Sequence, residues 1–294
     1  MVVSLGPRFL AIDWGTTNRR VYLIEDGAVA RTERDDRGVT AVAKGGFEAE
    51  AAAVRERFGD LPMLLAGMVG SNIGWRAAPY VAAPAGFGAL AEAVLWLDPR
   101  TGIVPGLSVV ADGRGDVMRG EEVQLLGAVA AGLAPADALL CQPGTHCKWA
   151  EMAGGEVACF TTAMTGELFA LLRKHGLLAA QLGGEVTPGD AFLAGVEEGK
   201  RRDLAASLFG IRAAGLLGLR DDADAAAFAS GLLIGGDVGA RLAGSAHDTV
   251  HILADPGLGG LYALAVEAHG RAARLVDSHA AFAAGIIRIG ELIA

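Results

Sequence analysis

A pattern of three short apolar strands joined by two glycine turns occurs twice in this chain of 294 residues. In the first copy the leading strand ends at Gly15-Thr16, and in the second it ends at Gly144-Thr145, 129 residues later. The strands are predicted over 9–13, 20–24 and 28–32 in the first copy and, in the second, over 139–141 and 156–160. Two halves of similar topology facing each other across a cleft are the better interpretation. The alternative is a chance match in a chain rich in glycine and alanine.

Helices and strands alternate along the rest of the chain, which predicts an α/β protein. At 294 residues the chain is long enough for two ordinary domains, and we place them at 1–134 and 135–294, with the option that the last helix packs back on the first domain. Further strands are predicted over 62–66, 103–110, 249–254 and 273–276. Helices are predicted over 48–58, 121–131, 166–175, 190–197, 224–234, 258–268 and 280–292.

Composition excludes several classes of protein. No apolar run approaches the roughly 20 residues that a spanning helix needs, and the first residues lack the pattern of a secretory signal. The three cysteines have no C-x-x-C spacing, which argues against a disulfide framework or a structural zinc site. A net charge of −9 disfavours a nucleic-acid partner. We therefore expect a soluble cytoplasmic protein that does not bind membranes.

The segment that follows the first strand, Asp13-Trp14-Gly15-Thr16-Thr17-Asn18-Arg19-Arg20, could bind phosphate. A glycine turn between strands exposes backbone N–H groups and lets a phosphate come close. Asp13 at the strand end is placed to hold Mg²⁺, which usually binds through one or two carboxylates together with substrate phosphates. An ordinary hairpin turn is the alternative, and the second Gly-Thr turn makes the phosphate hypothesis stronger.

These motifs resemble those of the actin–hexokinase superfamily of sugar kinases. Residues 13–20 are similar to its first phosphate motif, Gly144-Thr145 to its second phosphate loop and residues 254–261 to its adenosine loop. The block over 118–127 resembles the Gly-Asp-Gln helix start that carries the catalytic base in glycerol and xylulose kinases. This chain has Glu121 where that group has Asp.

Four segments together resemble, more narrowly, the 2-dehydro-3-deoxygalactonokinases: AIDWGTTNRR, LLAGMVGSNIGWRAAPY, VMRGEEVQLLGA and PGTHCKW. The resemblance implies two ribonuclease H-like domains of the actin-like ATPase type, each with a central mixed sheet, flanking an active-site cleft. It also implies ATP- and Mg²⁺-dependent phosphorylation of 2-dehydro-3-deoxy-D-galactonate on its terminal hydroxyl, a step of galactonate breakdown.

Candidate site residues follow from these motifs. The catalytic candidates are Glu121, Glu122 and Asp13, and Asp13 is also the metal ligand. Neighbours on a helix point about 100° apart, so only one of the two glutamates should face the cleft, and Glu121 is the first choice. We assign ATP to Gly15, Thr16, Thr17, Asn18, Arg20, Gly144, Thr145, His146, Gly257 and Gly259. We assign the sugar acid to Ser71, Asn72, Arg119, Thr165 and Glu167.

Some alternatives stay open at this point. The chain could be an actin-like nucleotide-binding regulator without a small-molecule acceptor, although the 118–127 block argues for a second site. It could also be a kinase for another 2-keto-3-deoxy sugar acid, such as 2-dehydro-3-deoxygluconate, because the two acids differ at one stereocentre. Arg20 and Arg76 compete with Arg119 for the substrate carboxylate. Neither a monomer nor a homodimer is excluded.

Overall fold

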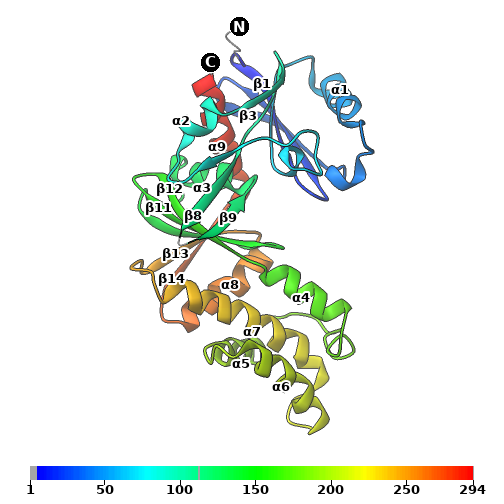
Figure 1. The fold of residues 1–294 in the computed structure, drawn as a ribbon, viewed down its shortest axis with the longest axis vertical. Helices are drawn as coiled ribbons and strands as arrows, with labels where there is room; N and C mark the ends of the chain where they lie inside the picture. Colours follow the sequence, from blue (N-terminus) through cyan, green and yellow to red (C-terminus); the bar gives the residue numbers. More distant parts are fainter. Residues whose placement is uncertain (1–4, 112, 294) are drawn as a thin grey trace. The chain divides into compact units, whose positions relative to one another are not determined.

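The computed structural model describes residues 5–111 and 113–293, which form two compact units (Figure 1). The first unit contains the described residues up to 137 together with 151–160 and 277–293. The second contains 138–150 and 161–276. The last helix therefore belongs with the N-terminal part of the chain. Each unit is described by itself below.

A six-stranded mixed sheet forms the centre of the first unit, in the order β3-β2-β1-β4-β7-β6. Strand β1 is antiparallel to β2 and parallel to β4, and it is buried because both of its faces are covered. A second, three-stranded sheet has the order β5-β8-β9. The strands are β1 (Arg8–Trp14), β2 (Arg19–Glu25), β3 (Ala28–Asp35), β4 (Met63–Ala66), β5 (Tyr80–Ala82), β6 (Leu95–Asp98), β7 (Thr101–Ile103), β8 (Gly106–Ala111) and β9 (Arg114–Met118).

Helices cover both faces of the six-stranded sheet. Helix α1 (Phe47–Phe58) packs on one face in a core with residues of β1 and β4, and α9 (Ser278–Ile293) contacts β1. Helix α3 (Glu121–Ala130) lies against α9 at backbone distance, since a Cβ on Gly127 would lie 1.9 Å from the Ala281 carbonyl oxygen. Shorter helices in this unit are η1 (Val39–Ala41), η2 (Met68–Gly70) and α2 (Phe87–Glu92).

The five-stranded sheet has the order β12-β11-β10-β13-β14. Its β10 is parallel to β13, and β13 is parallel to β14. The order repeats that of β3-β2-β1-β4-β7, in which β1, β4 and β7 are also parallel neighbours. The shared order supports the internal duplication. The strands are β10 (Ala138–Gln142), β11 (Cys147–Ala153), β12 (Glu156–Ala163), β13 (Thr249–Leu253) and β14 (Ala272–Val276).

The helices of the second unit gather around α7, which is buried along most of its length (Figure 1). Residues of α5, α7 and α8 share one core with the sheet strands β10, β11 and β13. Helices α5 and α7 meet through glycine, because a Cβ on Gly231 would lie 2.0 Å from the Phe192 carbonyl oxygen. The helices are α4 (Thr165–Lys174), α5 (Asp190–Gly199), α6 (Leu204–Leu216), α7 (Asp222–Leu242) and α8 (Pro256–Ala268).

The predicted α/β class is confirmed, and every strand and helix named from the sequence has a counterpart at nearly the same residues. The extended segment predicted over 103–110 is split at Pro105 between β7 and β8, which belong to different sheets. Helix α6 was not predicted, since its apolar residues surround the helix and show no helical stripe. The polar edge strand β9 was also missed. Within the described ranges, no helix combines the length and apolarity needed to cross a bilayer.

Candidate active site

The first Gly-Thr turn, residues 15–18, joins β1 to β2 as a tight hairpin. The Gly15 N–H donates to the Asn18 carbonyl oxygen at 3.0 Å, and Asp13 pairs with Arg20 across the two strands. The Thr16 side chain is exposed and the Thr17 hydroxyl accepts from the Asn18 side-chain amide. The turn therefore exposes two threonine side chains and backbone groups at the end of a hydrogen-bonded strand pair. Exposed donors of this kind are what a phosphate loop requires.

A neighbouring segment, residues 38–40, is hydrogen-bonded to the backbone of this turn. The Gly38 N–H donates to the Thr17 carbonyl oxygen at 3.3 Å, and the Val39 N–H donates to that of Gly15 at 3.0 Å. The Thr40 hydroxyl donates to the carbonyl oxygen of Thr16 at 2.8 Å. A Cβ at position 38 would lie 2.3 Å from the Thr17 carbonyl carbon, so only glycine allows this approach.

Two glycines bring the start of α3 to the end of β1. Gly67 follows β4 with φ +95°, and a Cβ there would lie 2.9 Å from the Trp14 carbonyl oxygen and 3.5 Å from Asp13 Oδ1. Gly120 precedes α3 with φ +104°, and its Cβ would lie 2.9 Å from the Gly67 Cα. Both the left-handed backbone and the close approach require glycine. As a result, the glutamates that open α3 lie next to Asp13.

The Asp13 carboxyl group is partly buried and has an unusual pKa. Burial raises the pKa to about 6 and the negative charge of Glu121 raises it as well, while the Arg20 guanidinium acts in the opposite direction. A carboxyl group perturbed by burial and by named charges at a strand end is a candidate for function.

The two glutamates of α3 occupy different environments. Glu121 is partly exposed, and its Oε2 accepts from the Arg119 backbone N–H at 3.0 Å. Glu122 has no exposed surface, and both of its oxygens accept from the Gly120 N–H, at 2.8 and 2.7 Å. Only Glu121 is therefore accessible to a ligand in this structure.

Arg119 is buried beside these carboxylates, with 8% of its surface exposed. Its Nη2 donates to the Ala78 carbonyl oxygen at 2.8 Å, and its guanidinium carbon lies 4.4 Å from the centre of the Tyr80 ring. Nε and Nη1 have no hydrogen-bond partner among the described residues. A buried cation with two unused donors is costly unless an anion completes it.

The loop after β4 reaches the same arginine. A Cβ on Gly70 would lie 2.9 Å from Arg119 Nη1. Next to it, the Ser71 hydroxyl donates to the Met68 carbonyl oxygen at 2.7 Å and accepts from the Ile73 N–H. Ser71 therefore shapes the loop, whereas the Asn72 side chain is exposed and makes no such bond among the described residues.

Helix α9 begins beside Arg20. The Arg20 guanidinium contacts His279 Nδ1, and the Asp277 carboxylate accepts from the backbone N–H groups of His279 and Ala280. These bonds keep the pKa of Asp277 below its usual range despite partial burial. The start of α9 thus holds the Arg20 side chain, and Arg20 lies opposite Asp13 in the β1–β2 hairpin.

The second Gly-Thr turn, between β10 and β11, is covered by the start of α4. A Cβ on Gly166 would lie 2.3 Å from the Gly144 carbonyl oxygen, so helix and turn touch through backbone. The Glu167 N–H donates to the Thr145 carbonyl oxygen at 2.9 Å. The Glu167 carboxylate pairs with His146 Nε2 at 2.5 Å. Glu167 therefore belongs with this turn.

Thr165 is bonded to a buried carboxyl group. Its hydroxyl donates to Asp237 Oδ2 at 3.1 Å, and the Trp149 indole N–H donates to the same oxygen at 3.0 Å. Burial raises the pKa of Asp237 above its usual range. Trp14 and Trp149 are both core residues.

A cavity of about 260 Å³, here called the Gly144 cavity, opens beside the second turn. Its polar lining comes from Gly144, Thr145 and Ser230, and its apolar lining includes Phe169 and Tyr262. Leu258 connects it to the start of α8, the predicted adenosine loop. Within that loop, a Cβ on Gly257 would meet no atom within 4 Å, whereas one on Gly259 would lie 2.9 Å from Leu275.

Comparison with known proteins assigns the family. The model of the 2-keto-3-deoxy-galactonokinase family matches residues 13–289, nearly the whole chain. The chain belongs to this family. The 2-dehydro-3-deoxygalactonokinase of Escherichia coli (strain K12) is 38% identical over 294 residues, covering 98% of this chain and 99% of the relative.

Solved structures agree with this 2-keto-3-deoxy-galactonokinase assignment. A crystal structure from Sinorhizobium meliloti, provisionally assigned as a 2-dehydro-3-deoxygalactonokinase, has a TM-score of 0.88 at 38% identity, with 95% of this chain and 96% of that chain covered. The activator of 2-hydroxyisocaproyl-CoA dehydratase from Clostridium difficile, with bound ADPNP, has a TM-score of 0.50 at 9% identity, with 97% and 95% covered. The latter likeness concerns the fold, which is of the actin-like ATPase type.

As a 2-keto-3-deoxy-galactonokinase, the chain is a carbohydrate kinase, and a kinase uses ATP as its phosphoryl donor. The family assignment therefore excludes the alternative of an actin-like nucleotide-binding regulator without a small-molecule acceptor. The structure brings Asp13, Arg20, Arg119 and Glu121 together in the first unit. It places Thr165 and Glu167, predicted for the sugar acid, beside the second Gly-Thr turn in the other unit.

Several residues of this site were not found from the sequence. Gly38 and Asp237 are the clearest, because each acts on a segment far away in the chain. No local motif marks them. The role of Gly67, which positions α3 against β1, was not found from the sequence either.

The donor set of the first unit fits one Mg²⁺. No group of three or more His, Cys, Asp or Glu side chains suited to a metal ion occurs in the described part of the chain. A magnesium ion held by one carboxylate, water and substrate phosphates needs no such group. The raised pKa of Asp13 indicates a carboxylate that a nearby cation would stabilise in its charged form.

Glu122→Gln is expected to change the pH dependence of stability. Burial and the Glu121 charge raise the pKa of Glu122 to about 8, from an ordinary value near 4.5. The folded protein therefore holds a proton that the unfolded chain has lost, and its free energy of unfolding falls as the pH rises from about 4.5 to 8. Glutamine is uncharged at every pH, so the variant should gain on the order of 1–3 kcal/mol over wild type at pH 8 and nothing at pH 4.5.

Urea unfolding of both proteins across this pH range measures the difference. Glu48→Gln is the matched control, because Glu48 also opens a helix but is exposed. Its difference from wild type should not grow with pH. A Glu122→Gln curve parallel to that of wild type would show that Glu122 is ionised when buried.

Proposed function

We propose that this kinase transfers the γ-phosphoryl group of ATP to the terminal 6-hydroxyl of 2-dehydro-3-deoxy-D-galactonate, in the breakdown of galactonate. The family match over residues 13–289 carries this proposal. The site supports it, because carboxylates for phosphoryl transfer and a buried, incompletely bonded arginine for an acidic substrate occur side by side. The products are ADP and 2-dehydro-3-deoxy-6-phospho-D-galactonate.

Glu121 is the proposed general base. It is the partly exposed member of the glutamate pair, and the helix start that it opens resembles the one that carries the base in glycerol and xylulose kinases. As the sugar hydroxyl attacks the γ-phosphorus, a new O–P bond forms and the bond to the β-phosphate oxygen breaks. The hydroxyl proton passes to the Glu121 carboxylate, and ADP leaves. Glu122, which is buried, holds the Gly120 N–H and so fixes the start of the helix.

The two Gly-Thr turns are the proposed phosphate sites. Thr16 and Thr17 offer backbone and hydroxyl donors, Gly15 lets a phosphate come close to the backbone, and the segment over 38–40 keeps the turn in place. Gly144 and Thr145 line the Gly144 cavity, which has room and apolar walls suited to a nucleoside. Phosphoryl transfer depends mainly on positioning and charge neutralisation, and both turns supply the former.

Asp13 would hold Mg²⁺, which neutralises phosphate charge when it is bound. Arg20 lies across the hairpin from Asp13 and is kept there by its contact with His279. Arg119 is the proposed partner of the sugar-acid carboxylate, because its Nε and Nη1 are buried without partners. Asn72 is exposed on the loop beside Arg119 and is a second candidate for the sugar hydroxyls.

Release of ADP in the presence of each of two epimeric acids tests the proposal. With 2-dehydro-3-deoxygalactonate, kcat/KM should exceed that with 2-dehydro-3-deoxygluconate, and without either acid ADP release should be close to background. Equal rates with both epimers would overturn the assigned specificity. ADP release that does not depend on a sugar acid would overturn the kinase site proposed here.

A further inference from the structure

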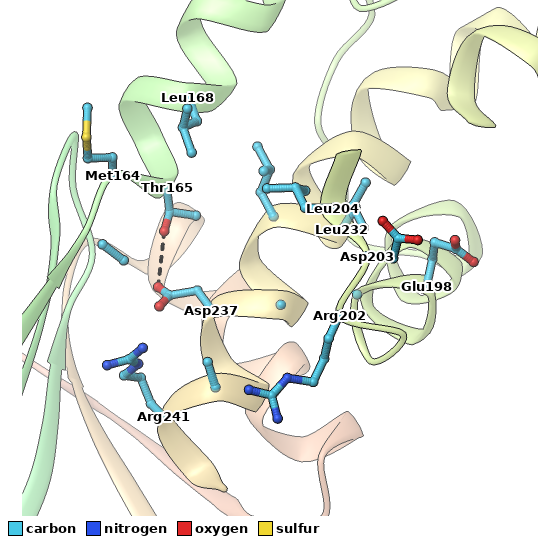
Figure 2. Close-up of a pocket in the computed structure, with 15 residues that line it drawn as sticks. Met164, Thr165, Leu168, Glu198, Arg202, Asp203, Leu204, Leu232, Asp237 and Arg241 are labelled. Carbon is cyan, nitrogen blue, oxygen red and sulfur yellow. Dashed lines mark hydrogen bonds between the residues drawn. The ribbon is translucent and has the colours of Figure 1, made fainter. Parts of the chain in front are cut away.

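A second cavity in the same unit has no part in the proposed reaction. It measures about 270 Å³ and lies where the start of α4, the end of α5, the start of α6 and the second half of α7 meet (Figure 2). We call it the α5–α7 cavity. It shares Thr165 and Leu233 with the Gly144 cavity, but its other lining residues are different. All of them belong to the second unit.

Much of the wall of the α5–α7 cavity is apolar. Met164 and Leu168 line it from the α4 side, and Leu204 and Leu232 from the α6 and α7 sides. Met164, Leu168 and Leu204 are among the exposed large apolar side chains of the chain. Apolar surface that is open to solvent in a concave site indicates a ligand with an apolar part.

The acidic side chains of this cavity already have partners. Glu198 accepts from the Ser207 hydroxyl at 2.7 Å and pairs with Arg201 at 3.4 Å. Asp203 caps the start of α6 by accepting from the Ala206 N–H. Asp237 accepts from Trp149 and Thr165. Their hydrogen-bonding capacity is therefore largely used within the protein.

The two arginines that line the cavity lack hydrogen-bond partners of this kind. Neither Arg202, which is exposed, nor Arg241 makes a side-chain hydrogen bond or an ion pair with any described residue, and Arg241 Nε is buried without a partner. The Arg241 charge acts on the Asp237 carboxyl group, where it opposes the effect of burial on the pKa, but it donates no hydrogen bond to it. Figure 2 shows both guanidinium groups toward one end of the cavity, away from Met164 and Leu168. A guanidinium group binds carboxylate or phosphate oxygens with paired N–H donors.

Arg202 is also held in an uncommon conformation. Its φ is +58°, in the left-handed region that favours glycine, just after α5 ends. Most residues other than glycine, asparagine and aspartate are disfavoured there. Glycine would suit the backbone better, so an arginine at this position points to a use for its side chain.

We propose that the α5–α7 cavity binds a small organic carboxylate with a short apolar body, its carboxylate on Arg241 and Arg202 and its apolar part against Met164, Leu168 and Leu204. The sugar acid of the reaction does not match this site, because its hydroxyl groups would face apolar walls. The inference does not depend on the proposed reaction, since binding can be measured without turnover.

Titration calorimetry with hexanoate tests the site. Wild type should bind hexanoate saturably, with one site per chain and millimolar affinity, and should bind the uncharged hexanol and the short acetate at least tenfold more weakly. Arg241→Gln should weaken hexanoate binding about tenfold or more, and Arg241→Lys should restore part of it. Arg274→Gln is the matched control, because Arg274 is exposed in the same unit and does not line the cavity.

Arg202→Gly separates a ligand role from a structural one. It relieves the left-handed backbone, so the melting temperature should rise by roughly 2–4 °C while hexanoate binding weakens. Unsaturable binding to wild type, or unchanged affinity in both Arg241→Gln and Arg202→Gly, would overturn the proposal. Competition between hexanoate and ADP for one site would overturn it too, because the cavity would then be part of the nucleotide site. Binding that persists with ADP present supports a separate site.

Discussion

Replacing Glu121 by glutamine is expected to lower kcat by about 10²–10⁴-fold, the range that a positioned general base contributes. Glutamine keeps the size of the side chain and can still accept from the Arg119 backbone N–H, as Glu121 does at 3.0 Å. It cannot take up the proton of the sugar hydroxyl. The loss should therefore appear in the chemical step, with the KM for ATP nearly unchanged.

Single-turnover kinetics with saturating ATP and sugar acid measure that step directly. Glu48→Gln is the matched control, because Glu48 is also a first-turn glutamate, on α1, and should retain wild-type kcat. Glu122→Gln provides the second comparison, since Glu122 is fully buried and is expected to act through the helix start. A normal kcat in Glu121→Gln together with a large loss in Glu122→Gln would reverse the assignment of the base.

The sequence was informative where chemistry and local structure coincide. A strand, a glycine turn and a strand are contiguous, so the two Gly-Thr hairpins and their duplication could be predicted from residue order. The carboxylate pair at 121 and 122 is also local, because a first helical turn favours acidic residues. Glu121 was preferred to Glu122 by its position in the motif, whereas the complete burial of Glu122 depends on the packing of α3 against α9, which the residue order does not show.

Most of the site features that the sequence did not predict depend on contacts between segments far apart in the chain. Gly67 and Gly120 are 53 residues apart, yet only their backbone contact explains why Glu121 lies near Asp13. Arg202 gives a second example, since its φ of +58° leaves no trace in the residue order. Helix α6 shows a different limit, because its apolar residues lack the periodicity on which helix prediction depends.

Arg119→Gln is expected to lower kcat/KM for the sugar acid by about 10²–10³-fold, which corresponds to the cost of truncating one partner of a buried charge pair. Most of the effect should be a higher KM for the sugar acid. The carboxylate lies at the opposite end of the substrate from the reacting hydroxyl, so its binding energy is about equal in ground and transition states. The KM for ATP should remain within about twofold of wild type, because no step of nucleotide binding uses Arg119.

A structural role of Arg119 makes a different prediction. Its Nη2 donates to the Ala78 carbonyl oxygen at 2.8 Å, so the variant should also lose about 1 kcal/mol of stability. If support of that loop were its only function, kcat and both KM values would change together. Assays well below the melting temperature, with Arg114→Gln as an exposed control on β9, distinguish the two. An unchanged KM for the sugar acid in Arg119→Gln would assign the substrate carboxylate to another cation, and Arg20 would be the first to examine.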